Sequence, residues 1–219
     1  HEVCVFERRA PEGSLAFNQG TVVIAVLDYG AGNLRSVQNG LDAVGCEYSL
    51  VRDAAGLRDA AKIILPGVGH FGQMMRALDT LQVRDALLDQ IAAGTPFLGI
   101  CLGLQALFEA SEEAPDERGL GIFPGIVQRF PAHARVPHMG WDEVEWRKQG
   151  RLRAEGQDSA FFYFAHSFYA PIGEFSSGVC TYEVPYTAVL EEGNVCGVQF
   201  HPEKSGAEGL ALVGRFAAA

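Results

Sequence analysis

One cysteine stands between two glycines in the segment Gly99-Ile-Cys-Leu-Gly103, directly after the largely apolar run of residues 95–98. This pattern is the thiol counterpart of the Gly-x-Ser-x-Gly turn, in which a buried strand turns sharply into a helix and exposes a nucleophile. Small residues flank such a turn because its backbone is strained and closely packed. We expect residues 102–109 to form the helix, whose N-terminal dipole favours the thiolate of Cys101. The segment therefore predicts a fold in which buried strands lead into helices.

Apolar runs alternate with helical patterns along the first half of the chain. Residues 22–28 form a continuous apolar run, which is typical of a fully buried strand. A helix is expected next, capped by Asn33 and closed by Gly45, because apolar residues recur between them at helical spacing. The same reasoning predicts strands at 48–51 and 62–65 and a helical stretch over 74–91. Strands that alternate with helices indicate a parallel sheet.

The second half changes character after Gly121. Segments rich in β-branched and aromatic residues, such as 161–164 and 177–182, are separated by prolines and glycines, which favours antiparallel strands. We therefore predict an α/β fold with a flavodoxin-like mixed, mostly parallel sheet flanked by helices, to which antiparallel strands are added in the second half.

Length and composition set the domain count. A chain of 219 residues with 48% apolar residues fits one domain with an ample core, which we assign to residues 21–219. Residues 1–20 lack clean periodicity and an initiating methionine, so we interpret them as an extension that is non-native or disordered.

Charge and cysteine usage exclude several classes of protein. A formal net charge of −10 opposes a general nucleic-acid or anionic-membrane role, and no apolar run approaches the roughly 18–20 residues of a membrane span. Five cysteines without zinc-type spacing suggest neither a disulfide framework nor a metal site. We expect a cytoplasmic protein that binds neither nucleic acid nor membrane and carries no metal.

A base for the cysteine is offered by the segment Phe200-His-Pro-Glu-Lys204. His201 and Glu203 are two residues apart, so in extended backbone both side chains project to one face and can form a hydrogen bond. The second ring nitrogen of His201 is then free to meet Cys101, which gives the arrangement of nucleophile, base and orienting group. Each motif alone has a simpler reading, as a buried apolar cysteine and a surface or structural histidine.

The segment Leu65-Pro-Gly-Val-Gly69 follows a predicted strand, and its glycines expose backbone N–H groups that can hold an oxyanion. An ordinary tight loop is the alternative. The pair Gly30-x-Gly32 indicates only a turn, because Arg35 occupies the third glycine position of a dinucleotide-binding fingerprint.

Taken together, three motifs resemble those of class I, triad-type glutamine amidotransferases: Leu65-Pro-Gly-Val-Gly69, Gly99-Ile-Cys-Leu-Gly-Leu-Gln105 and Gln199-Phe-His-Pro-Glu-Lys-Ser205. Further segments are similar to the glutaminase subunits of imidazole glycerol phosphate synthase, namely Asp28-Tyr-Gly-Ala-Gly-Asn33, Gly67-Val-Gly-His-Phe-Gly72, Glu109-Ala-Ser-Glu-Glu113 and Pro137-His-Met-Gly-Trp141. The resemblance covers residues 22–216 and implies the amidotransferase fold.

The resemblance implies a reaction and a set of site residues. Cys101 attacks the side-chain amide of L-glutamine to give a thioester and ammonia, His201 passes the proton and Glu203 orients His201. The N–H groups of Val68 and Leu102 stabilise the oxyanion. The glutamine pocket is expected to include Gly67, Gly69, Gln105, Glu113, His166, Ser167 and Phe168. Phe168 stands where relatives often carry tyrosine, so only its backbone role transfers. No cofactor is implied.

The resemblance also implies a partner. A separate, barrel-shaped cyclase subunit receives the ammonia and forms imidazole glycerol phosphate in histidine biosynthesis, within a heterodimer. Asn33, Met139, Trp141 and Lys204 are expected near that interface, although Trp141 fits a core position and Lys204 a solvated charge equally well.

Two alternative functions stay open at this point. One is the glutaminase subunit of another synthase, such as the pyridoxal phosphate-forming complex, which lacks the Pro137-His-Met-Gly-Trp141 segment. The other is a non-enzymatic protein whose elbow cysteine senses oxidation, for which His201 and Glu203 are not needed.

Overall fold

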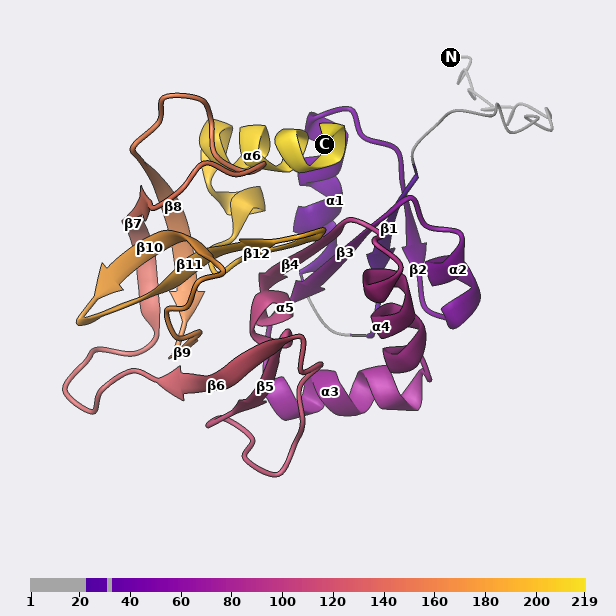
Figure 1. Ribbon diagram of the computed structural model, residues 1–219, viewed down its shortest axis with the longest axis horizontal. Helices are drawn as coiled ribbons and strands as arrows, with labels where there is room; N and C mark the ends of the chain where they lie inside the picture. Colours follow the sequence, from indigo (N-terminus) through magenta and orange to yellow (C-terminus); the bar gives the residue numbers. More distant parts are fainter. Residues whose placement is uncertain (1–22, 31–32) are drawn as a thin grey trace, which may run out of the picture.

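A nine-stranded mixed sheet runs through the computed structural model, which describes residues 23–30 and 33–219 (Figure 1). In spatial order its strands are β2 (Tyr48–Val51), β1 (Ile24–Leu27), β3 (Lys62–Gly67), β4 (Phe97–Cys101), β12 (Val195–Val198), β11 (Val184–Glu192), β10 (Ser176–Tyr182), β7 (His138–Trp146) and β8 (Ser159–His166). The expected extension at residues 1–20 lies outside the described residues.

The sheet has a parallel part and an antiparallel part. Strands β2, β1, β3, β4 and β12 pair in parallel. Strands β12, β11, β10, β7 and β8 pair in antiparallel fashion. The mixed α/β sheet predicted from the sequence is therefore confirmed, with the antiparallel strands all in the later part of the chain. These added strands make as many pairings as the parallel ones, so the parallel part does not predominate.

Helices cover both faces of the parallel part (Figure 1). Helices α1 (Leu34–Ala43) and α6 (Gly206–Ala218) pack on one face, whereas α2 (Ala54–Arg58), α3 (Phe71–Thr80) and α4 (Arg84–Ala92) pack on the other. Side chains alternate between these faces along β1, where Val26 joins the core under α1 and α6 and Leu27 joins the opposite core. This alternation explains why the buried strands read as continuous apolar runs.

The helix expected over residues 102–109 is wrong in length. Helix α5 (Leu102–Gln105) makes one turn, and the chain then enters β5 (Phe108–Ser111), which pairs in parallel with β6 (Phe123–Arg129). Strand β9 (Phe168–Tyr169) completes this second, three-stranded sheet. All residues from 102 to 108 are buried, so the segment has no polar face to indicate where a surface helix ends.

Three other expectations need correction. The helical stretch at 74–91 is two helices, because the chain breaks at Gln82, whose φ of +55° is incompatible with a continuing helix. The strand expected to stop before Pro66 continues through it to Gly67. Asn33 occupies the N-cap position of α1 as expected, but its side chain makes no capping hydrogen bond.

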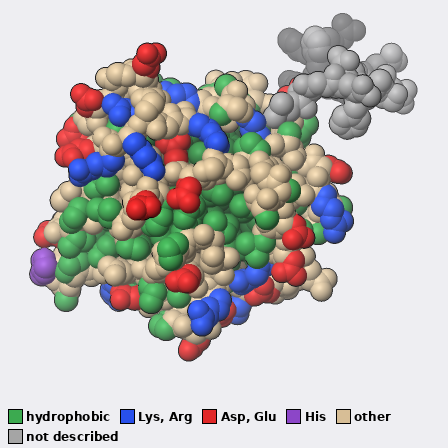
Figure 2. All heavy atoms as spheres, in the orientation of Figure 1, with side chains coloured by type: hydrophobic (Ala, Val, Ile, Leu, Met, Phe, Trp, Pro, Cys, Tyr) green, Lys and Arg blue, Asp and Glu red, His purple; other side chains and the backbone are tan. Residues whose placement is uncertain are grey.

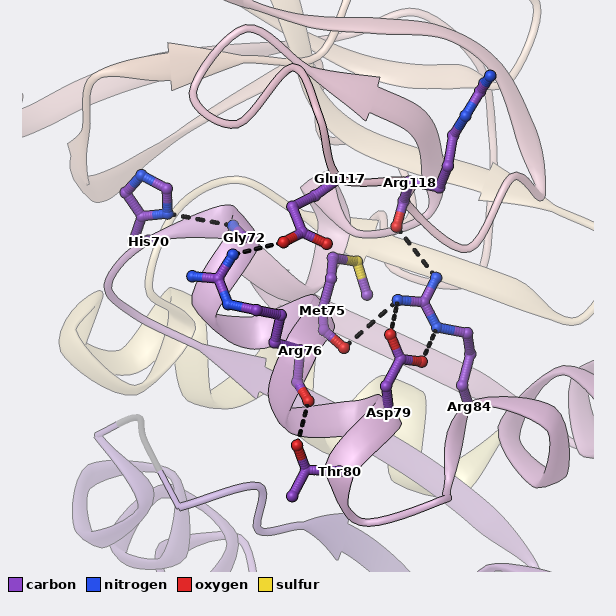
Figure 3. Close-up of polar contacts among 9 residues, drawn as sticks. All are labelled: His70, Gly72, Met75, Arg76, Asp79, Thr80, Arg84, Glu117 and Arg118. Atoms are coloured by element: carbon purple, nitrogen blue, oxygen red, sulfur yellow. Dashed lines mark hydrogen bonds and ion pairs between the residues drawn. The ribbon is translucent and has the colours of Figure 1, made fainter.

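Polar contacts hold the loop after β5 against α3 (Figure 3). Arg76 pairs with Glu117 of this loop. Arg84 pairs with Asp79 and donates to the carbonyl of Arg118, 3.0 Å away. The loop carries Glu113, which is thereby placed beside the N-terminus of α3.

No helix among the described residues is long and apolar enough to cross a membrane.

Candidate active site

Cys101 ends β4 in a strained conformation. Its φ is +53° and its ψ −104°, in a region that non-glycine residues rarely adopt. A Cβ atom on Gly103 would overlap the carbonyl oxygen of Leu65, so only glycine allows α5 to approach β3 this closely. The sharp strand-to-helix turn expected from the sequence is therefore present. Because α5 has a single turn, it lacks the long helix dipole that the sequence led us to expect at Cys101.

His201 and Glu203 form the expected hydrogen bond, with 2.9 Å between His201 Nδ1 and Glu203 Oε1. The backbone that brings them together is not the extended segment that was predicted. Residues Pro202–Lys204 form a short 3-10 helix, η1, and only His201 itself is extended. The second oxygen of Glu203, Oε2, is buried and has no hydrogen-bond partner among the described residues. Both side chains are 3% exposed, so their interaction is shielded from water.

The electrostatics of His201 favour its charged form. Burial lowers the pKa of His201, but hydrogen bonding to Cys101 and Glu203, together with their charges, outweighs burial and raises the pKa to about 10. An imidazolium is thus held between a sulfur and a carboxylate. This arrangement places a protonated imidazole beside the sulfur of Cys101.

Strand register places the predicted oxyanion segment beside Cys101. Gly67, at the end of β3, is the partner of Cys101 in the parallel pairing of β3 and β4. A Cβ atom on Gly67 would lie 2.7 Å from the Cβ of Leu102, so glycine is required there. Val68 and Gly69 follow, and Gly69 has a φ of +104°, which favours glycine.

A cavity of about 170 Å³ opens at Cys101. The residues that line it come from five separate segments: Val68, Gly69, Cys101, Leu102, Gln105, Glu113, Pro137, Ala165, His166, Ser167 and Phe168. All the expected pocket residues except Gly67 are in this set, and Gly67 lies directly behind Leu102. Pro137 and Ala165 also line the cavity and were not predicted.

Gln105 and Glu113 are held by backbone groups at the cavity wall. Gln105 Nε2 donates to the carbonyl of Phe168 over 2.8 Å, and Glu113 Oε2 accepts from the N–H of Phe71 over 2.7 Å. The carboxylate of Glu113 therefore stands at the N-terminus of α3, where the helix dipole favours negative charge. The carbonyl of Phe168 serves as the acceptor for Gln105, whereas the backbone role expected for Phe168 in binding glutamine stays a prediction.

Comparison with known proteins decides the family. The sequence pattern of "Glutamine amidotransferase class-I" matches residues 25–217. This chain belongs to the class I glutamine amidotransferases.

Individual relatives narrow the comparison within the class I glutamine amidotransferases. The imidazole glycerol phosphate synthase subunit HisH of Desulfitobacterium hafniense (strain DSM 10664 / DCB-2) is 44% identical over 196 residues, which cover 89% of this chain and 93% of that protein. The subunit of the same name from Thermococcus kodakarensis is 47% identical over 200 residues, covering 89% and 98%.

Solved structures agree on the fold. A structure titled "Crystal structure of glutamine amidotransferase" superposes with a TM-score of 0.71 at 21% identity, covering 90% of this chain and 99% of that one. The structure of PurLQS from Thermotoga maritima gives a TM-score of 0.70 at 20% identity, covering 90% and 97%. At these identities the likeness shows the class I amidotransferase fold alone.

Sequence reasoning missed one contact of this amidotransferase site. Gln199 is fully buried, and its Nε2 donates to the Sγ of Cys101 over 3.7 Å. Its Oε1 accepts from Gln105 Nε2 over 3.1 Å, so the glutamine links the sulfur to the cavity wall. Gln199 belongs to one of the motifs noted in the sequence, but its side-chain direction follows only from the pairing of β12 with β4.

Tyr29 was also missed. Its hydroxyl is buried, and no hydrogen-bond partner exists for it among the described residues. Burial raises the pKa of this hydroxyl, and the nearby N–H of Val68 only partly offsets the effect. The tyrosine is thus placed behind the predicted oxyanion segment.

The four residues expected near a partner do not share one environment. Met139 and Trp141 project from β7 and are 63% and 56% exposed, which is unusual for side chains of this size. Lys204 in η1 is exposed as well, whereas Asn33 is partly buried. Phe161 of β8 is 57% exposed on the same face of this strand pair, and the sequence did not single it out as exposed.

Proposed function

We propose that this chain is the glutaminase subunit of an imidazole glycerol phosphate synthase. It hydrolyses L-glutamine to glutamate and ammonia, and the ammonia passes to a cyclase subunit that forms imidazole glycerol phosphate in histidine biosynthesis. The observation that carries the proposal is the strained Cys101 beside the buried His201–Glu203 pair, in a chain 44–47% identical to proteins named as HisH subunits of this synthase.

The first half of the reaction uses Cys101 and His201. The thiolate Sγ attacks the side-chain carbonyl carbon of glutamine, a C–S bond forms, and the carbonyl electron pair moves onto oxygen. When this tetrahedral intermediate collapses, the C–N bond breaks and the leaving nitrogen takes a proton from the imidazolium of His201. The products are ammonia and a thioester on Cys101.

The second half regenerates the enzyme. His201, now neutral, takes a proton from a water molecule as the water oxygen attacks the thioester carbon. The C–S bond then breaks, glutamate leaves, and the charged pair of thiolate and imidazolium returns. Glu203 accepts the Nδ1–H of His201 throughout, which keeps Nε2 directed at the reacting atoms.

Oxyanion stabilisation is assigned to the N–H groups of Leu102 and Val68. Leu102 directly follows the nucleophile, and Val68 lies in the segment whose Gly67 neighbours Cys101 in the sheet. Loss of one such donor typically costs about 3 kcal/mol of transition-state stabilisation. The orientation of the Val68 peptide can therefore switch activity, and we expect the isolated chain to be nearly inactive.

Glutamine itself is bound by the cavity wall. The carboxylate of Glu113 and the backbone of Ser167 and Phe168 provide partners for the amino and carboxylate groups of the substrate, and Gly69 leaves room beside them. Gln105, whose amide donates to the Phe168 carbonyl, completes the wall.

We place the barrel-shaped cyclase on the face that carries Met139, Trp141 and Phe161. Large exposed apolar side chains on one strand pair are typical of a partner surface. Lys204 lies close by, because the Cβ position of Gly206 in the adjoining helix is 3.8 Å from the ring of Trp141.

The described cysteines are free thiols, which fits the cytoplasm as the place of action.

Glutamate release from L-glutamine tests the proposal. We expect little release by the purified chain alone and strong stimulation by a histidine-pathway cyclase subunit with its ribonucleotide substrate bound. Cys101→Ser is the matched control and should abolish release while leaving cyclase binding intact. Release that is independent of the cyclase would assign the chain to another glutaminase, and no release under any condition would overturn the enzymatic role.

A further inference from the structure

A chain of hydrogen bonds leads away from the cavity through buried side chains. His166 Nδ1 lies 2.8 Å from the carbonyl oxygen of Phe168, and His166 Nε2 lies 3.3 Å from the hydroxyl of Tyr186. The same hydroxyl lies 3.2 Å from His138 Nδ1. His138 Nε2 is 3.3 Å from the carboxylate of Asp142, whose side chain is 32% exposed. The chain thus connects the glutamine cavity to the surface at β7.

The direction of the first bonds follows from the chemistry of the groups. A carbonyl oxygen only accepts, so His166 must carry its proton on Nδ1 to bond Phe168. Burial lowers the pKa of His166 to about 3, so the ring is neutral and Nε2 holds a lone pair. Tyr186 is then required to donate its single proton to Nε2.

The contact between Tyr186 and His138 needs one more proton than a neutral His138 can supply. If Tyr186 donates to His166, its contact with His138 is a hydrogen bond only when Nδ1 of His138 is protonated; the thiol of Cys180, which is also hydrogen-bonded to Tyr186, can donate to the other lone pair of the same oxygen. Asp142 is an acceptor too, so Nε2 of His138 must also carry a proton. Every bond is therefore satisfied only when His138 is an imidazolium. With neutral His138, whose proton goes to Asp142, two imidazole nitrogens compete for one phenol proton.

Few charges act on His138 from the elements around it. Asp142, on its own strand, is the carboxylate that favours the charged ring. His166 of β8, Cys180 of β10 and Tyr186 of β11 face it but are neutral, because burial raises the pKa of Cys180 to about 12 and that of Tyr186 well above its usual range. The ring of Tyr182, also on β10, stacks on His138 at 4.0 Å. Burial lowers the pKa of His138, and Asp142 opposes this.

We propose that Tyr186 and His138 are positioning residues for glutamine binding. Tyr186 fixes the tautomer and orientation of His166, which in turn holds the Phe168 carbonyl and the cavity segment 166–168. When His138 is protonated, the Tyr186 hydroxyl donates to His166 alone, and segment 166–168 is held more firmly in position. The proposal rests on the proposed glutaminase function, since it assigns residues that act on the same site.

Gln105 links the position of the Phe168 carbonyl to the surroundings of Cys101. It donates to that carbonyl and to Gln199, which contacts the sulfur of Cys101. A shift of the carbonyl therefore changes the cavity wall on the side of the nucleophile as well. Buried networks of this kind respond to the loss of one member along their length.

The first test is kinetic and compares two tyrosines of the same aromatic cluster. Tyr186→Phe removes the hydroxyl that bonds both histidines, whereas the control Tyr182→Phe removes a hydroxyl that donates only to the carbonyl of Arg135. In the complex with the cyclase we expect Tyr186→Phe to raise KM for glutamine about 2- to 10-fold, the loss of one hydrogen bond, with a smaller change in kcat. An unchanged KM, or equal effects of both substitutions, would overturn the proposal.

The pH profile separates positioning from packing. Wild-type KM for glutamine should fall as the pH is lowered through the titration of His138, and His138→Gln should give a flat profile over the same range. Equal profiles for the two proteins would contradict the role of His138.

Side-chain nitrogen NMR tests the hydrogen-bond chain without turnover, and its first measurement uses the unsubstituted protein. His166 is expected as the Nδ1–H tautomer, and an Nε2–H tautomer would refute the assignment. Titration of Cys101→Ser with L-glutamine should shift the His166 signals. This measurement stands even if glutamate release fails, so failure of the proton chain is distinguished from failure of the proposed function.

Discussion

The side-chain amide of Gln199 donates a hydrogen bond to the sulfur of Cys101, with 3.7 Å between Nε2 and Sγ. The two residues are far apart in sequence and meet because β12 lies beside β4 in parallel register, with Val198 opposite Ile100. The contact places a neutral hydrogen-bond donor beside the sulfur, and hydrogen bonds to a charged acceptor are stronger than those to a neutral one.

Gln199→Glu should slow the reaction of Cys101. The substitution keeps an oxygen that can accept from Gln105 but replaces the donor beside the sulfur by a negative charge, which opposes the thiolate. We expect alkylation of Cys101 by iodoacetamide at neutral pH to slow about 10- to 100-fold, the effect of losing a hydrogen bond to a charged group. Gln90→Glu, on α4 and away from the cavity, is the control and should leave the rate unchanged.

Glu203→Gln should lower the pKa of His201. Hydrogen bonding to Cys101 and to Glu203 holds this pKa at about 10, so removal of the Glu203 charge moves the titration downward. Because the pKa of His201 is higher in the folded chain than in the unfolded one, protonation of His201 stabilises the fold. This contribution is fully present below the unfolded pKa of about 6.5 and is lost as the pH rises through the folded pKa of about 10. The stability of the variant should therefore depend less on pH across this window. NMR titration of the His201 ring measures the shift, and an unaltered midpoint would refute the assigned coupling.

Gly103→Ala should destabilise the fold. The added methyl group overlaps the Leu65 carbonyl oxygen, and overpacking against backbone costs about 1–3 kcal/mol. Gly214→Ala offers the matched control, since no atom lies within 4 Å of the added Cβ and the site is inside α6. That change should stabilise the chain by about 0.5–1 kcal/mol. Urea unfolding of both variants measures the difference, and equal effects would contradict the close approach of α5 to β3.

Trp141→Ala should weaken binding of the cyclase subunit. Exposed tryptophans at the centre of an interface typically contribute about 2 kcal/mol or more, which corresponds to roughly a 30-fold rise in Kd. Leu50→Ala is the control, because Leu50 is 43% exposed on β2 at the opposite edge of the sheet. Titration calorimetry with the cyclase distinguishes the two. Equal Kd values for the variants would remove Trp141 from the interface.

Much of the site could be predicted because the residues within each motif are close in sequence. The glycines around Cys101 are required by a strained turn, and the two-residue spacing of His201 and Glu203 allows their hydrogen bond in more than one backbone conformation. That tolerance explains why the contact was predicted correctly although the backbone is a 3-10 turn. Local chemistry was sufficient for these residues.

Elements that lack a polar face were predicted less accurately than these motifs. Residues 102–108 are buried on all sides, so the pattern did not distinguish a long helix from one turn followed by a strand. The pairing of β5 with β6 decides this, and the packing of Gly119 against the carbonyl of Phe108 reinforces it. A backbone contact of this kind leaves no periodic signal in the sequence.

The sequence by itself determined the alternating α/β order, the strained turn at Cys101 and the histidine–glutamate pair, because turns, apolar periodicity and short spacings act locally. Only the tertiary structure decided which distant side chains meet: Gln199 at Cys101, and Tyr186 between His138 and His166. The physical reason is that the direction of a buried polar side chain depends on which strand pairs with which, and that pairing is settled by packing of the whole sheet.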